Sequence, residues 1–152
     1  MVFSMSGKPI DILLVEDNPG DATLAREAFR DCKVRNQLYI VDDGVKALDF
    51  LAQRGDYEGM PLPDLILLDL NLPGKHGREV LQCIKNSKQL KSIPVVILTG
   101  SDADEDVIKS YALHANCFIT KPMDLDQYLQ VVKSIEDFWL TIVKLPPHGY
   151  TQ

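Results

Sequence analysis

The sequence lacks any long hydrophobic run and has little cysteine. Within its 152 residues, the wholly apolar stretches 65–68 and 95–98 are far shorter than the ~20 residues that a membrane-spanning helix requires. The three cysteines form no Cys-x-x-Cys pair, and an odd cysteine count without a signal peptide is typical of a reducing compartment. We therefore expect a cytoplasmic protein with no membrane segment, in which Cys32, Cys83 and Cys117 are small buried side chains.

The chain also lacks an excess of positive charge. It has 16 lysines and arginines against 22 aspartates and glutamates, a formal net charge of -6. Nucleic-acid phosphates are bound mainly through basic groups, so we expect no nucleic acid partner. With 45% hydrophobic and 25% charged residues, the composition is that of one soluble domain. We expect this domain over residues 8–143, between an N-terminal tail at 1–7 and a proline-rich tail at 144–152.

Three short apolar runs predict the centre of a sheet. Residues 11–16, 65–70 and 94–99 are almost continuously apolar and do not alternate with polar residues. That pattern is typical of parallel strands that helices cover on both faces. Two shorter runs bounded by polar residues, at 38–41 and 117–120, predict flanking or edge strands.

A helical pattern follows each predicted strand. Apolar residues recur at three- and four-residue spacing, and Asn18 followed by Pro19 is typical of a helix start. Five strand and helix units with right-handed crossovers predict a doubly wound, flavodoxin-like α/β fold, (βα)5, with a parallel sheet of order 2-1-3-4-5. In such sheets, ligands bind beyond the carboxyl ends of the strands.

Four predicted strands end in reactive polar residues, which are Glu16, Asp17, Asp69, Thr99 and Lys121. Because strands 1, 3, 4 and 5 are neighbours in the predicted order, we expect one pocket with three carboxylates and one ammonium. Clustered carboxylates repel unless a cation resolves the conflict, and hard oxygen ligands suit Mg2+. Asp69 is then suited to be an oxygen nucleophile in phosphoryl transfer, with Thr99 and Lys121 holding phosphoryl oxygens.

This constellation resembles the receiver domain of two-component response regulators. The resemblance extends from about residue 8 to residue 135, and it includes the run 72–74 and Gly77 behind Asp69 and the Lys121-Pro122 pair. It implies that Asp69 accepts a phosphoryl group from a histidine kinase in a phosphorelay. It also implies that the chain turns over no dedicated substrate and catalyses its own phosphorylation and dephosphorylation.

The resemblance further implies a ligand set for Mg2+. Asp17, Asp69 and the backbone carbonyl of Asn71 would bind the ion directly, and Glu16 would act through a bound water. The acidic pair here is Glu-Asp where many family members have Asp-Asp. This change lengthens the reach of the first side chain without removing its charge.

A conformational switch is implied as well. Thr99 and Phe118 occupy the switch positions of the family, and the bond between Lys121 and Pro122 would be cis. The positions that flank the phosphoryl group are Asn71 and Ser101, whose small side chains offer few obstacles to water.

The last predicted helix, at 125–143, is apolar over a wider arc than a sheet requires. Val131, Phe138 and Ile142 form a second stripe, and the whole apolar arc approaches ~200° where about 100° suffices. We expect this surplus to contact a partner, most simply a second copy of the chain, through helix 4, strand 5 and helix 5. The alternative is that Phe138 and Ile142 fold back on the same domain.

A narrower resemblance links the chain to the small response regulators of phytochrome-type histidine kinases. It is carried by the tail at 144–152, the long 55–63 connection and the runs 68–73 and 135–139. It implies a light-sensing, phytochrome-like kinase as the partner. We expect no output domain, so the signal would leave through contacts of the receiver itself.

Three other functions fit the same fold. A haloacid-dehalogenase-like phosphatase also uses a nucleophilic Asp with Mg2+, but the position of its general acid/base is occupied here by Asn71. A flavodoxin-like FMN protein needs a first loop that cradles a phosphate, whereas the loop at 16–21 carries three carboxylates. The third is a non-catalytic receiver-fold adaptor, against which the complete set of site residues argues.

Overall fold

Five parallel strands form one sheet in the order β2-β1-β3-β4-β5, which confirms the predicted topology. The strands are β1 (Ile10–Val15), β2 (Asn36–Val41), β3 (Leu65–Asp69), β4 (Val95–Thr99) and β5 (Cys117–Thr120). This computed structural model describes residues 9–70, 72, 76–99, 117–122 and 124–144. The tail at 1–7, residues 145–152 and the predicted helix between β4 and β5 lie outside this range.

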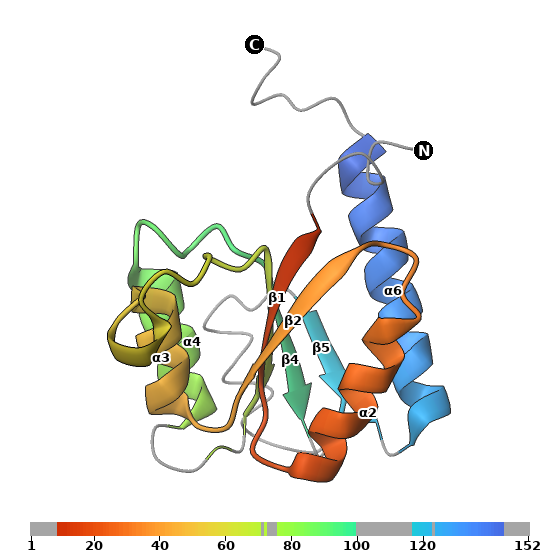
Figure 1. The fold of residues 1–152 in the computed structure, drawn as a ribbon, viewed down its shortest axis with the longest axis horizontal. Helices are drawn as coiled ribbons and strands as arrows, with labels where there is room; N and C mark the ends of the chain where they lie inside the picture. Colours follow the sequence, from red (N-terminus) through yellow and green to blue (C-terminus); the bar gives the residue numbers. More distant parts are fainter. Residues whose placement is uncertain (1–8, 71, 73–75, 100–116, 123, 145–152) are drawn as a thin grey trace.

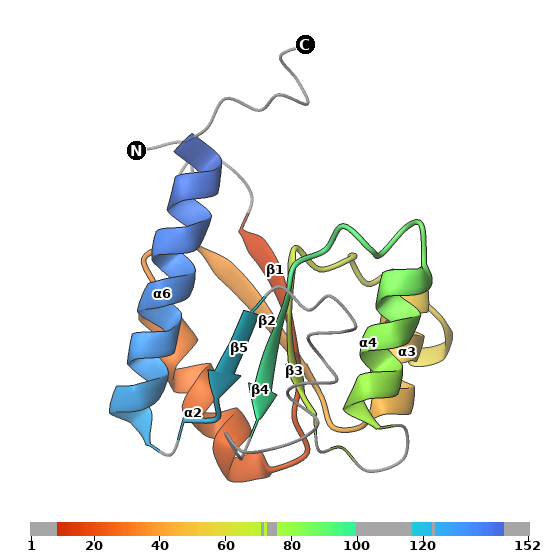
Figure 2. The same cartoon turned by 180° about the vertical axis from the view of Figure 1, so that it is seen from behind.

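Helices cover both faces of the sheet (Figures 1 and 2). On one face, α2 (Pro19–Arg30) and α6 (Leu125–Lys144) lie side by side. On the other face lie α3 (Gly44–Ala52) and α4 (Gly77–Asn86), and the short 3-10 helix η1 (Gly55–Tyr57) follows α3. Among the described helices, none has both the length and the apolar character needed to cross a membrane.

The two faces of the sheet explain the continuous apolar runs. In β1, Leu13 and Val15 belong to the core under α3 and α4, whereas Ile12 and Leu14 belong to the core under α2 and α6. All four side chains are fully buried. Because successive side chains of a strand point to opposite faces, both alternating sets must be apolar when both faces are covered.

The start of α2 follows the prediction from Asn18 and Pro19. Asn18 is the N-cap, its side-chain oxygen accepts a hydrogen bond from the backbone N–H of Asp21 at 3.0 Å, and Pro19 opens the helix. This cap satisfies one of the N–H groups that a helix start leaves without a partner inside the helix. The first turn of α2 is thereby held directly beside the end of β1.

The packing of α6 corrects one expectation. Val131 was expected on a partner surface, but only 8% of it is exposed, and it belongs to the core between the sheet, α2 and α6. Because α6 packs against α2 as well as against the sheet, its buried arc is wider than the sheet alone requires. Phe138 and Ile142 lie within α6, but their side chains are outside the described part of the chain.

The expectation for the cysteines was also partly wrong. Cys83 is exposed on α4, and Cys32 is only partly buried at the end of α2. The side chain of Cys117 lies outside the described part. Burial raises the pKa of the Cys32 thiol to about 12, so this thiol stays protonated at neutral pH.

Candidate functional site

The ends of β1 and β3 bring two buried carboxylates together. The register pairs Val15 with Leu68, so Glu16 and Asp69 follow as neighbours at the same edge of the sheet. Each is only 2% exposed. A buried carboxylate is costly unless it is paired with charge or hydrogen-bonded, so the site must supply compensating groups.

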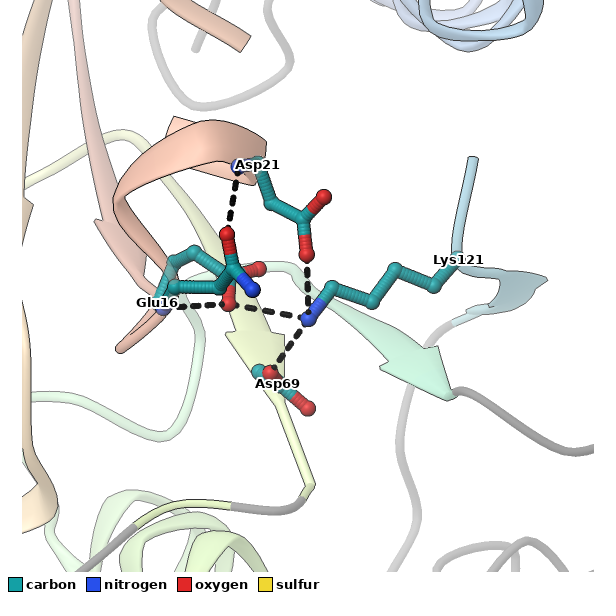
Figure 3. A network of polar contacts seen from close by, with 5 residues as sticks. Glu16, Asp21, Asp69 and Lys121 are labelled. Carbon is teal, nitrogen blue, oxygen red and sulfur yellow. Dashed lines mark hydrogen bonds and ion pairs between the residues drawn. The ribbon is translucent and has the colours of Figure 1, made fainter. Parts of the chain in front are cut away.

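One compensating group is Lys121, which follows the end of β5. Figure 3 shows its side chain extending toward the carboxylates of Glu16, Asp21 and Asp69. The ammonium nitrogen lies 2.9 Å from Glu16 Oε2, 2.9 Å from Asp21 Oδ2 and 2.9 Å from Asp69 Oδ2. Burial acts to lower the pKa of Lys121, but the hydrogen bonds to these three carboxylates outweigh it and raise the pKa. Lys121 is therefore charged at neutral pH.

The Glu16 carboxyl has a strongly shifted pKa. Burial is the main cause that raises it, the hydrogen bonds with Lys121 and Asn18 act against the rise, and the charge of Asp69 adds to it, so that the pKa is about 7 instead of 4.5. The backbone N–H of Asn18 donates to Glu16 Oε2 at 3.1 Å. A single ammonium therefore does not fully compensate the two buried acids.

The carboxylates of Glu16, Asp17 and Asp69 fit a cation. One oxygen from each lies within 4.8 Å of the other two, and Asp17 is exposed to solvent. Glu16 Oε1 is buried and has no hydrogen-bond partner among the described residues. A divalent cation among these oxygens would give Glu16 Oε1 a partner and balance the excess negative charge, since carboxylates are the ligands that hard divalent cations prefer.

Solvent reaches the cluster through an open cavity of about 360 Å3. Glu16 and Asp17 line it from the end of β1, and Arg26, Lys46 and Tyr57 line it from α2, α3 and η1. A small ion can therefore reach Glu16 and Asp17 of the acidic cluster from solvent.

The backbone behind Asp69 is tightly packed against the start of α4. A Cβ at Gly77 would lie 2.6 Å from the carbonyl oxygen of Asp69 and 2.6 Å from Leu70 Cα. The N–H of Gly77 donates to the carbonyl of Leu70 at 3.2 Å. Only glycine permits this close approach, which accounts for the Gly77 noted in the sequence.

Asp21 was not among the predicted site residues. It lies in the first turn of α2, where the Asn18 cap holds its backbone N–H, and its carboxylate pairs with Lys121 at 2.9 Å. The only signal in the sequence was that Asp21 is the third carboxylate of the loop at 16–21. The sequence cannot show that this loop folds back to the end of β5.

Several predicted site residues are only partly described or not described. Thr99 ends β4 and pairs with Thr120 of β5, and Phe118 lies within β5, but the side chains of Thr99 and Phe118 are outside the described part. Asn71 and Ser101 lie outside the described residues.

The expectation of a cis bond before Pro122 was wrong. The described part of the chain contains no cis peptide bond, so the bond between Lys121 and Pro122 is trans. The trans isomer is the lower-energy state of an X-Pro bond unless tertiary contacts favour cis. With this bond trans, Lys121 still pairs with all three carboxylates.

Comparison with known proteins agrees with the geometry. Residues 12–133 match the response regulator receiver domain. Response regulator Rcp1 of a Synechocystis species is 50% identical over 141 residues, which cover 93% of this chain and 96% of Rcp1.

Solved structures show the same likeness. The phosphorylated cyanobacterial phytochrome response regulator RcpA is 49% identical with a TM-score of 0.83, and the alignment covers 91% of this chain and 99% of RcpA. The Mn2+-bound form of Rcp1 is 51% identical with a TM-score of 0.81, over 91% of this chain and 99% of that one. Sequence, fold and the arrangement of buried acids around Lys121 thus agree, and the chain belongs to the response regulator receiver domain family.

Proposed function

We propose that this chain is a phosphoacceptor switch in a two-component phosphorelay, with Asp69 as the residue that is phosphorylated. One observation carries the proposal: the buried Asp69 carboxylate lies beside both a lysine ammonium, at 2.9 Å, and a cluster of acids that fits a cation. Positive charge on two sides of a carboxylate is what transfer of a phosphoryl group requires, because charge on the phosphoryl oxygens must be compensated.

Asp69 supplies the nucleophile in this proposal. One of its carboxylate oxygens attacks phosphorus, the bond between phosphorus and the histidine nitrogen breaks, and its electron pair returns to that nitrogen. The imidazole, protonated on its other nitrogen, leaves as a neutral ring. The position of Asp69 at the end of β3 keeps the carboxylate in place while the donor approaches.

Lys121 and Thr99 hold the phosphoryl group in this proposal. Lys121 already donates to Asp69 Oδ2 at 2.9 Å, so a small movement brings its ammonium to a phosphoryl oxygen. Thr99 ends the strand next to β3, which supports a role for its hydroxyl on a second oxygen.

The proposed cofactor is Mg2+, held by Glu16, Asp17 and Asp69 and by the backbone carbonyl of Asn71. When bound, Mg2+ would neutralise part of the charge that develops on the phosphoryl oxygens. The carboxylate cluster and the buried Glu16 Oε1 support a divalent cation, and all-oxygen ligands suit a hard cation such as Mg2+.

The chain is proposed to pass on its signal by changing the surface that contacts other proteins. On phosphorylation, Thr99 moves toward the new oxygens and Phe118 moves inward, which shifts the face near β5 and α6 between two populations. Phe138 and Ile142 remain the proposed contact residues of a homodimer. The proposed location is cytoplasmic, and no nucleic acid partner is proposed.

The proposed phosphoryl donor is a phytochrome-type histidine kinase. Support comes from the likeness to the phytochrome response regulator RcpA over 91% of this chain. A purified phytochrome-type kinase should phosphorylate the chain faster than a histidine kinase with an unrelated sensor domain does. Equal rates from both kinases would contradict this part of the proposal.

Labelling with radioactive acetyl phosphate in Mg2+ tests the phosphoacceptor directly. The wild type should be labelled, Asp69→Asn should not, and Asp126→Asn, which changes an exposed aspartate of α6, should behave as the wild type. Removal of Mg2+ with a chelator should abolish labelling. Equal labelling of Asp69→Asn, or steady turnover of a phosphomonoester by the wild type, would overturn the proposal.

A further inference from the structure

Lys121 has more carboxylate partners than the proposed chemistry needs. Glu16, Asp21 and Asp69 each lie 2.9 Å from its ammonium nitrogen. An ammonium has three N–H donors, so these three contacts use all of them. Glu16 and Asp69 also belong to the cluster that fits a cation, whereas Asp21 does not. A cation and Lys121 therefore compete for the carboxylates of Glu16 and Asp69. Asp21 is a partner of Lys121 for which the cation does not compete.

We propose that Asp21 is a positioning residue that retains the Lys121 ammonium when a divalent cation takes Glu16 and Asp69. Asp21 touches neither the cation nor the phosphoryl group and acts only through Lys121. Its effect is to raise the affinity of the acidic cluster for the cation. This inference rests on the proposed metal site and adds a residue that tunes it.

The surroundings of Asp21 favour a charged side chain in a fixed place. Asn18 Oδ1 accepts from the N–H of Asp21 at 3.0 Å, and the positive end of the α2 dipole stabilises a carboxylate in the first turn. The side chain of Asp21 is 26% exposed, against 1% for Glu16 and 3% for Asp69. Asp21 is therefore the least buried of the three acids, and its carboxylate can keep Lys121 as a partner while Glu16 and Asp69 change theirs.

The charges of this cluster also act on Tyr128 of α6. Its hydroxyl is buried and has no hydrogen-bond partner within the part of the chain that the structure describes. Burial raises the pKa of Tyr128, and the negative charges of Glu16 and Asp21 raise it further. The side chains of Lys121 and Asp21 are only 19% and 26% exposed, so the attraction between them is stronger than that of a pair at an open surface.

The sign of the effect follows from the competition. Without Asp21, the Lys121 ammonium rests on Glu16 and Asp69 alone, and an arriving cation must displace it with no carboxylate left to receive it. Loss of the Asp21 charge also weakens attraction for any cation. The loss of charge acts whether or not Lys121 is present, whereas the displacement of the ammonium requires Lys121. A double-mutant cycle separates the two effects.

The experiment is a calorimetric titration of Mg2+ into the full chain at constant ionic strength, which measures the affinity for Mg2+. We expect Asp21→Asn to weaken Mg2+ binding about 3- to 10-fold when Lys121 is present and less than about 2-fold in the Lys121→Met background. Asp21→Glu keeps the charge and should retain most of the affinity. Glu27→Gln removes an exposed carboxylate from the same helix and should bind Mg2+ as the wild type does.

Nitrogen-15 NMR of the lysine ammonium group gives a second readout that involves no phosphorylation. The Lys121 signal is assigned by its loss in Lys121→Met. In the wild type it should stay protected from hydrogen exchange when Mg2+ is added, and in Asp21→Asn the addition of Mg2+ should abolish that protection. If Lys121→Met fails to fold, Lys121→Gln serves in both measurements.

Two results would overturn the inference. One is that Asp21→Asn weakens Mg2+ binding by the same factor in both backgrounds, and the other is that it has no effect when Lys121 is present. If the proposed function is wrong, the result is different, because acetyl phosphate then does not label the wild type itself. A labelled wild type with an Asp21→Asn variant of unchanged Mg2+ affinity refutes the role of Asp21 alone.

Discussion

The ammonium of Lys121 donates to the carboxylate of Glu16 at 2.9 Å, although 105 residues separate the two in the sequence. Glu16 follows β1 and Lys121 follows β5, and strands β3 and β4 lie between them in the sheet. The contact therefore spans the strand ends and passes beside Asp69. It places the Lys121 ammonium next to Glu16 and Asp69, two buried acids that would otherwise repel each other.

Glu16 should make stability depend on pH. Its pKa is about 7 in the folded chain against 4.5 when unfolded, so between these values the folded state binds a proton that the unfolded chain has released. Stability therefore falls as pH rises through this window and is level above it. Relative to Glu16→Gln, the free energy of unfolding of the wild type should fall by about 1 to 3 kcal/mol.

Urea denaturation without divalent cations, at several pH values from 4.5 to 7.5, measures this difference. Glu27→Gln changes an exposed acid and should keep the pH dependence of the wild type. A difference between wild type and Glu16→Gln that stays constant across this range would contradict the assignment.

Removal of the Lys121 ammonium should destabilise the chain and increase its dependence on Mg2+. Lys121→Met leaves Glu16 and Asp69 buried without their cationic partner, which should cost about 2 to 4 kcal/mol in the absence of metal. Because Mg2+ then compensates carboxylates that have lost the Lys121 ammonium, its addition should raise the melting temperature of this variant more than that of the wild type.

Thermal denaturation with and without Mg2+ provides the measurement. Arg54→Met is the matched control, because Arg54 forms an exposed ion pair with Asp49 at 2.9 Å and its loss should change little. An equal Mg2+ effect on wild type and Lys121→Met would show that Lys121 and the cation do not share partners.

Gly77→Ala should disturb the site from behind. The added Cβ would meet the carbonyl oxygen of Asp69 at 2.6 Å and that of Leu70 at 2.8 Å, and these backbone atoms must shift to make room. We expect a loss of about 1 to 3 kcal/mol of stability, as for other overpacked positions. The rate of acetyl phosphate labelling should fall as well, because Asp69 moves with its backbone.

Chemical denaturation and labelling kinetics check both effects. Gln82→Ala on the exposed side of α4 should leave stability and labelling close to those of the wild type. Wild-type behaviour of Gly77→Ala would mean that the start of α4 can move away from β3 without consequence.

The order of the sheet was predictable because of its two-sided burial. Runs such as 65–68 are apolar at every position because alternate side chains enter two different cores, which is typical of parallel strands covered by helices on both faces. The gathering of Glu16, Asp69 and Lys121 then followed from the strand order, since parallel strands end at one edge.

The incorrect expectations concern contacts that no periodic pattern encodes. Val131 was assigned to a partner surface because the sheet alone does not need it, but α2 covers it within the same chain. The isomer of the bond before Pro122 depends on tertiary contacts, which the residues next to the bond do not reveal. Cys83 was expected to be buried from residue type alone, yet its position on α4 is exposed.

The sequence by itself determined the alternation of strands and helices and the acids and lysine at the strand ends. These features are local, since they depend on hydrophobic periodicity and on the residue that follows each strand. Only the tertiary structure decided that Asp21 joins Lys121 and that Val131 is buried. Both depend on how α2 packs against the C-terminal part of the chain, which is distant from it in the sequence and meets it only when the core under α2 and α6 forms.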